Sequence, residues 1–138
     1  MTYSGTKSKD KITDPSAAAN LCRKAFAPIE EELELREHFL VIFLNRANNP
    51  IGYYHLATGG ITSTVVDVRL AFSVALKCLA TGMVLCHNHP SQNTKPSDND
   101  ILLTQKFKKA AEFLDINIVD HIILTKDSYH SMVSNGEF

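Results

Sequence analysis

The chain has little of what a membrane protein or a disulfide-rich secreted protein requires. No uninterrupted apolar run in its 138 residues approaches ~18 residues, so no transmembrane helix is predicted. Residues 1–10 are polar and lack the apolar centre of a signal peptide. Cysteine occurs three times, at Cys22, Cys78 and Cys86, without a regular spacing. We therefore expect free thiols, no membrane partner and a cytoplasmic location.

A large excess of charge of one sign is also absent. The formal net charge is −1, so no overall electrostatic field attracts nucleic acid. Lysines gather only in the N-terminal tail and around Lys106, Lys108 and Lys109, and no recognised DNA-binding motif accompanies them. Such clusters are usually solvated, which leaves nucleic acid a weakly supported partner.

The remaining composition, 44% apolar and 21% charged, is typical of a globular protein with one ordinary core. Residues 1–13 are rich in Lys, Ser and Thr and predict a disordered tail. Residues 14–138 predict a single domain with a mixed order of elements, which indicates an α/β or α+β fold with a mixed sheet. The expected helices span 16–26, 67–79 (or 69–79) and 98–114, and the expected strands span 39–44, 51–57, 61–65, 83–86, 116–124 and 129–133.

Two histidines follow the most buried of these expected strands. His87 and His89 come directly after the apolar run 83–86, and residues two apart on an extended chain point to the same face. Pro90 then ends the strand. Two imidazoles and one carboxylate leave a fourth zinc position open, as in catalytic zinc sites. On ligand chemistry alone, however, this pair is a weak signal, and two polar loop residues remain an alternative.

A serine and an aspartate three residues apart follow the two histidines. Ser97 and Asp100 precede a helical pattern, and Ser-x-x-Asp there is typical of a capping box. The same Asp100 would offer an ionised oxygen to a metal, because a helix N-terminus favours the carboxylate form. Both interpretations are compatible, and the cap is the commoner one.

The arrangement of His87, His89, Ser97 and Asp100 resembles the signature of JAMM (MPN+) metalloproteases, His-x-His, seven residues, Ser, two residues, Asp. The chain from about Pro28 onward is more similar to the RadC-like branch, long labelled "DNA repair protein", whose patterns are matched by Arg36-Glu37-His38-Phe39, Val66-Asp67-Val68-Arg69, His87-Asn88-His89-Pro90-Ser91, Pro96-Ser97 and Asp120-His121-Ile122-Ile123. The resemblance implies a cytidine-deaminase-like three-layer sandwich, in which helices flank the sheet. It also implies a zinc ion held by His87, His89 and Asp100. Gln92 departs from the pattern, where we expect glycine.

The resemblance further implies an upstream glutamate as general base, and Glu37 is our choice. Alternation places Glu37 on the face of Phe39, and a desolvated carboxylate has a raised pKa that suits a base near neutrality. Glu34 is the second choice, and a solvated acidic run is the alternative for both. His121 is predicted either to be satisfied in the core or to orient a ligand.

Together these expectations describe a zinc-dependent hydrolase that cleaves an amide or isopeptide bond in a peptide or protein. Ser97 would donate a hydrogen bond to the oxyanion. The competing hypothesis is a DNA-repair-associated or protein-binding module with a structural metal site.

Overall fold

The structure is a computed structural model that describes residues 11–59 and 65–138. Most of the tail predicted over 1–13, and residues 61–64 of one predicted strand, lie outside the described residues. Ile12 is described: its side chain is buried in the core, and its backbone N–H donates to the carbonyl of Asn48 at 2.9 Å.

Five strands form one mixed sheet in the order β2-β1-β3-β4-β5. Their bounds are β1 His38–Leu44, β2 Pro50–Thr58, β3 Gly82–Asn88, β4 Asn117–Leu124 and β5 Tyr129–Ser131. The β3–β4 pair is parallel, whereas the β1–β2, β1–β3 and β4–β5 pairs are antiparallel. The predicted α/β fold with a mixed sheet is confirmed.

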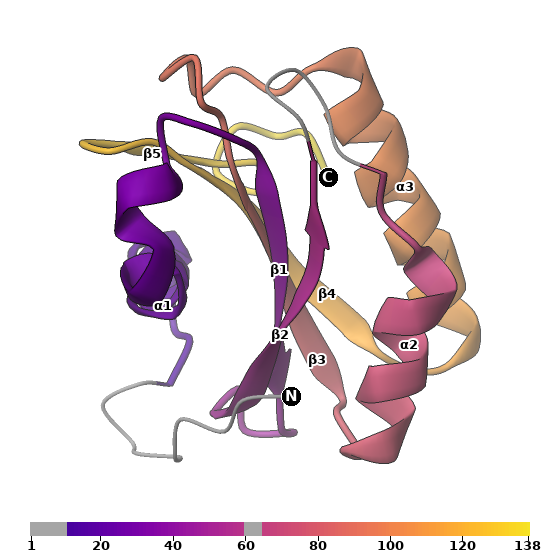
Figure 1. Cartoon of the computed structure of the whole chain (residues 1–138). Helices are drawn as coiled ribbons and strands as arrows, with labels where there is room; N and C mark the ends of the chain where they lie inside the picture. The colour runs from indigo at the N-terminus through magenta and orange to yellow at the C-terminus, as the bar shows by residue number, and fades with distance from the viewer. Residues whose placement is uncertain (1–10, 60–64) are drawn as a thin grey trace.

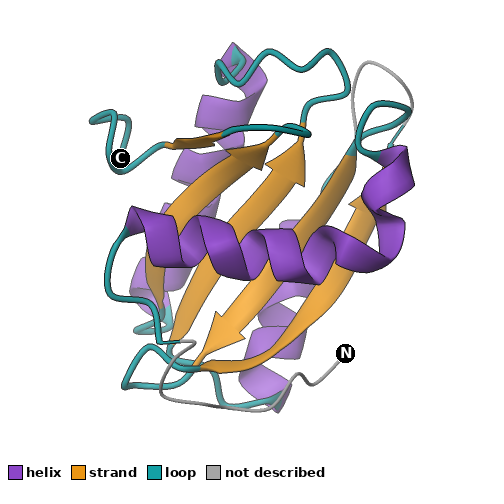
Figure 2. Ribbon diagram, turned by 90° about the vertical axis from the view of Figure 1, so that its left-hand side faces the viewer, coloured by secondary structure: helices purple, strands orange, loops and turns teal. Residues whose placement is uncertain are grey.

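Helices cover both faces of the sheet and complete three layers. Helix α1 (Pro15–Phe26) lies on one face, and α2 (Val68–Lys77) and α3 (Asp98–Phe113) lie on the other (Figure 1). Figure 2 shows α1 crossing the strands in front of the sheet, with the other two helices behind it. Because both faces are covered, every residue of the two central strands β1 and β3 is buried.

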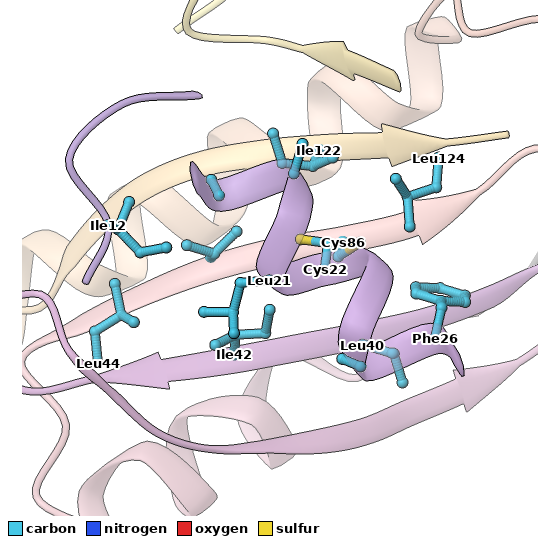
Figure 3. Close-up of a cluster of buried hydrophobic side chains, with 14 of the residues drawn as sticks. Ile12, Leu21, Cys22, Phe26, Leu40, Ile42, Leu44, Cys86, Ile122 and Leu124 are labelled. Atoms are coloured by element: carbon cyan, nitrogen blue, oxygen red, sulfur yellow. The ribbon is translucent and has the colours of Figure 1, made fainter. Parts of the chain in front are cut away.

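The core is divided by the sheet into two apolar layers. Figure 3 shows the layer beneath α1, where Leu21, Cys22 and Phe26 face Leu40 and Cys86 on the strands. The neighbouring strand residues point the other way and pack against α2 and α3; they include Phe39, Val41, Phe43, Met83 and Leu85. This alternation places odd-numbered residues of β1 and β3 on the α3 side, and it therefore decides which face His87 occupies.

Most element boundaries agree with the sequence predictions to within one residue. Strand β5, however, ends at Ser131, two residues before its predicted end, and Val65, the described residue of the strand predicted over 61–65, lies outside any strand. Strand β3 continues through Asn88, two residues beyond its predicted end, because β1 and β4 hydrogen-bond it on both sides. A 3₁₀ helix, η2 (Ala27–Glu32), occupies part of the predicted acidic run. Helix α2 ends at Lys77, two residues early, and Leu79 takes a left-handed φ of 59° just after it. Among the described residues, no helix is long and apolar enough to cross a membrane.

Candidate metal centre

The carboxyl end of β3 meets the N-terminus of α3, and three side chains converge there. The Nε2 atoms of His87 and His89 lie 3.0 Å apart. Asp100 Oδ1 lies 3.2 Å from Nε2 of His87, and Asp100 Oδ2 lies 3.0 Å from Nε2 of His89. The two histidines and the aspartate, which the sequence separates by up to thirteen positions, therefore form one cluster that could hold a metal ion.

Each imidazole has its other nitrogen fixed by a neighbour. His89 Nδ1 lies 2.7 Å from the carbonyl oxygen of Asn93, which can only accept, so Nδ1 carries the proton. His87 Nδ1 lies 2.7 Å from Nε2 of His121 on β4. Phe39 stacks on the His87 ring with the two centroids 5.7 Å apart, which fixes the plane of that ring. Both Nε2 atoms are thereby directed at the same point.

Asp100 serves both the helix cap and the cluster: Oδ2 takes part in the cap and contacts His89, and Oδ1 contacts His87. Ser97 Oγ accepts the backbone N–H of Asp100 at 3.0 Å, and Asp100 Oδ2 accepts the backbone N–H of Ser97 at 2.9 Å. The predicted capping box is therefore present. Its reciprocal bonds hold the carboxylate so that Oδ1 faces His87, and the Ser97 hydroxyl proton remains available to a further acceptor.

The cluster strongly favours an ionised carboxylate. Burial alone would raise the pKa of Asp100, but hydrogen bonds from His87 and His89, which their Nε2 atoms donate when the rings are protonated, outweigh it and hold that pKa well below its usual range. Burial lowers the pKa of His89, but its hydrogen bonds to Asp100 and to the Asn93 carbonyl raise the net pKa above the ordinary histidine value. A proton and a metal ion compete for His89 Nε2, so acid is expected to displace a bound metal.

The donor set fits zinc. Ligands at ~2.0–2.1 Å on a tetrahedral zinc ion are about 3.3 Å from one another. The two Nε2 atoms are 3.0 Å apart, and each lies 3.2 or 3.0 Å from one of the two Asp100 oxygens, so the contacts are of that size before any adjustment. Two neutral imidazoles and one carboxylate also supply only three ligands, which is the number found in catalytic zinc sites.

Glu37 lies beside the cluster at the start of β1. Its side chain is half-buried, and burial raises the pKa of its carboxyl; the nearby His87 lowers that pKa and the charge of Asp100 raises it further. Within residues 11–59 and 65–138 the carboxylate of Glu37 has no hydrogen-bond or ion-pair partner. Glu34, the second candidate, is exposed and lies 3.8 Å from the ammonium group of Lys126. The geometry thus favours Glu37 over Glu34 as a group available to a water molecule.

Asn88, between the two histidines, holds the segment that carries Glu37. Its amide group donates to the carbonyls of Leu33 at 3.0 Å and Arg36 at 2.9 Å. Its carbonyl oxygen accepts the N–H of His38 at 2.7 Å. The side chain is fully buried, so these bonds fix the chain on both sides of Glu37 relative to β3.

A cleft of about 770 Å³ opens over the cluster. Its walls combine polar groups and apolar side chains, among them Glu37, His89, Lys95, Ser97, Asp100 and Leu103. The structure therefore brings all five predicted site residues, including His87 beneath the cleft floor, to one place. The cleft that the described residues form is open to solvent on one side.

Gln92, where the resemblance implies glycine, has a left-handed φ of 67°. That conformation costs a non-glycine residue about 1–2 kcal/mol. The side chain offsets this strain by donating to the carbonyl of His89 at 3.2 Å and accepting the N–H of Lys126 at 2.8 Å. Gln92 therefore keeps the glycine-like turn and ties it to the segment after β4.

Three groups near the site were missed or left open by sequence reasoning. Thr104 lies one helical turn after Asp100, and that spacing could have indicated it. Asn88 gave no signal, because its partners are distant in sequence. His121 combines both predicted alternatives, since it is fully buried and also contacts His87. His55 and His130, to which no role was assigned, contact His38 and Glu137 instead.

Residues 12–137 match the model of the RadC-like JAB domain. A protein of Flavobacterium johnsoniae named "UPF0758 protein" is 49% identical over 128 residues, which are 93% of this chain and 54% of the relative. A UPF0758 protein of Porphyromonas gingivalis is 35% identical over 129 residues, 93% of this chain and 55% of its own. UPF0758 protein SH1266 of Staphylococcus haemolyticus is 34% identical over 130 residues, 94% and 55% of the two chains. The chain spans about half the length of these relatives.

Proposed function

The chain belongs to the RadC-like JAB domain family, and from this membership and the geometry of the site we propose that it is a zinc-dependent hydrolase of the JAMM type. The bond cleaved is an amide or isopeptide bond in a peptide or protein. The observation that carries the proposal is the convergence of His87, His89 and Asp100 in an open cleft beside the carboxylate of Glu37, which has no partner among the described residues.

In this proposal His87, His89 and Asp100 hold the zinc ion. Zinc in such a site acts as a Lewis acid and lowers the pKa of a water molecule to ~7. Glu37, with its raised pKa, takes a proton from the attacking water and returns it to the leaving amine. The Ser97 hydroxyl donates a hydrogen bond to the carbonyl oxygen as negative charge develops there, and removing one such donor costs ~2.7–4 kcal/mol in well-studied enzymes.

The experiment compares the zinc-loaded wild type with Glu37→Gln on a library of peptides that includes isopeptide-linked pairs. Newly formed amino groups are counted by mass spectrometry. We expect products from the wild type and a loss of roughly 10²–10⁴-fold in Glu37→Gln, since a positioned base contributes about that much. Glu37→Gln should keep its zinc. Glu34→Gln is the matched control, because it removes a neighbouring exposed carboxylate from the same cleft.

Equal cleavage by the wild type and Glu37→Gln would refute the role of Glu37, and equal loss in both glutamate variants would point to the charge of the cleft. A zinc-loaded wild type that cleaves nothing but binds DNA with a steep salt dependence would favour a nucleic-acid-binding module. The same proposal places the protein in the cytoplasm, which the three free cysteines support.

A further inference from the structure

We infer that His121 and Thr104 are positioning residues that hold the His87 ring in the tautomer whose Nε2 lone pair faces the metal. The inference rests on the proposed zinc site and assigns a function to two buried groups that do not contact the cleft. It is carried by an unbroken chain of short contacts from β3 to β4 and on to α3.

The chain of contacts begins at His87 and ends on the backbone of α3. His87 Nδ1 and His121 Nε2 are 2.7 Å apart, and His121 Nδ1 and Thr104 Oγ1 are 2.6 Å apart. Thr104 Oγ1 lies 2.8 Å from the carbonyl oxygen of Asp100, one turn earlier in the helix. This series of contacts therefore links the side chain of one proposed ligand, His87, to the backbone carbonyl of another, Asp100.

The number of protons available decides which group donates and which accepts in each of these hydrogen bonds. His121 and Thr104 are 0% and 1% exposed, so no water exchanges their partners. The carbonyl of Asp100 can only accept, so it receives the Thr104 hydroxyl proton. Thr104 Oγ1 then accepts from His121 Nδ1–H, and His121 Nε2 accepts from His87 Nδ1–H. The single proton of a neutral His87 is thus on Nδ1, and its Nε2 is free to bind a metal.

If every hydrogen bond in this series were reversed, His87 could not bind a metal. If Thr104 donated to His121, then His121 Nε2–H would donate to His87 Nδ1, and the His87 proton would lie on Nε2. That proton would point at Asp100 and occupy the lone pair that a metal needs. The other acceptor within reach of the Thr104 hydroxyl, Met132 Sδ at 3.5 Å, is weak, so the Asp100 carbonyl at 2.8 Å favours the metal-binding direction.

Packing supports the same arrangement. The Phe39 ring lies against His87 and, edge-on, against His121, with centroid distances of 5.7 and 5.6 Å. Neither imidazole can therefore rotate without displacing a buried phenylalanine. A histidine ligand whose second nitrogen is held in this way binds metal more tightly, and loss of such a partner typically weakens binding ~10–100-fold.

The test measures zinc affinity by competition with a chelator. Thr104→Val removes the hydroxyl at nearly constant volume, and His121→Phe keeps an aromatic ring for Phe39 but offers no acceptor. We expect each to bind zinc ~10–100-fold more weakly than the wild type. His121→Gln, whose amide can both accept and donate, should bind more tightly than His121→Phe. Thr125→Val is the control, because it removes another buried threonine hydroxyl, which contacts Ser128 and none of the proposed ligands.

A second measurement uses the wild type alone. In zinc-loaded protein, long-range ¹H–¹⁵N spectra should show His121 protonated on Nδ1 and His87 Nδ1–H protected from exchange. His121 protonated on Nε2 would overturn the inference, even if the variants did not fold. So would Thr104→Val and His121→Phe binding zinc as tightly as Thr125→Val, or His121→Phe binding better than His121→Gln. A folded wild type that takes up no zinc would instead overturn the proposed function, and this inference with it.

Discussion

Replacing Asp100 with asparagine separates the two roles that the structure gives to this carboxylate. Oδ2 accepts the N–H of Ser97 within the capping box, and Oδ1 faces Nε2 of His87. An asparagine side chain keeps one oxygen that can accept from Ser97, so the cap remains. It removes the negative charge, and a neutral amide oxygen is a much poorer partner for a zinc ion.

The two roles predict effects of very different size. Loss of one charge from the first turn of α3 is by itself expected to lower the free energy of unfolding of the metal-free protein by about 1 kcal/mol or less. This corresponds to a decrease in Tm of roughly 4 °C for a domain of this length. Zinc binding should weaken by more than ~100-fold, because residues that only orient a ligand already contribute about 10–100-fold.

Asp98→Asn is the matched control for this change. Asp98 lies in the same first turn of α3 and carries the same charge, but its side chain is exposed and outside the cluster. Elemental analysis should find about one zinc per chain in the wild type and in Asp98→Asn, and much less in Asp100→Asn. Thermal unfolding after chelation should give a decrease in Tm of this size for Asp98→Asn and a larger one for Asp100→Asn, which also loses its interactions with the two histidine rings. Unchanged zinc content in Asp100→Asn would leave Asp100 as a helix cap and refute the ligand assignment.

Three further predictions follow from buried groups. Because burial raises the pKa of Glu37 and a base works only when ionised, hydrolysis should fall as the pH decreases through that raised pKa, and a rate that rises in acid would contradict the assignment. Asn88→Ala loses three buried hydrogen bonds and should lower the free energy of unfolding by about 2–3 kcal/mol in urea, while its zinc content stays near that of the wild type. A thiol reagent should modify half-exposed Cys78 in the native protein, but buried Cys22 and Cys86 only after denaturation, and a total below three would indicate a disulfide.

The local patterns of the sequence were sufficient for most of the fold. The Asp14-Pro15 pair marks the start of α1 correctly, and the Asp14 carboxylate accepts the N–H of Ala17 at 2.8 Å. The extension of β3 through His87 and Asn88 could not be predicted, because polar residues usually end a buried strand. These two remain inside because distant groups satisfy them: His121 contacts His87, and three backbone groups bind Asn88.

In the site, too, local spacing predicts some features, whereas others depend on contacts between distant segments. The spacing of His87 and His89 predicts that they share a face, and alternation along β1 predicts the orientation of Glu37 toward the α3 side. The contact between His87 and His121 depends instead on the parallel pairing of β3 with β4, in which Leu85 is opposite His121. No local pattern fixes the register of two strands that are joined through a long helix, so this contact becomes visible only in three dimensions.

The Ser97-x-x-Asp100 pattern shows why sequence alone could not choose between a cap and a ligand. A cap needs a carboxylate oxygen within reach of the Ser97 N–H, and a metal needs an ionised oxygen directed away from the helix. The carboxylate has two oxygens, and the capping bond at 2.9 Å fixes one of them so that the other faces His87. The helix cap therefore supports the proposed metal site, because the hydrogen bond that begins α3 also orients the proposed ligand. A residue that served only as a ligand, without the capping bond, would place its oxygen less accurately.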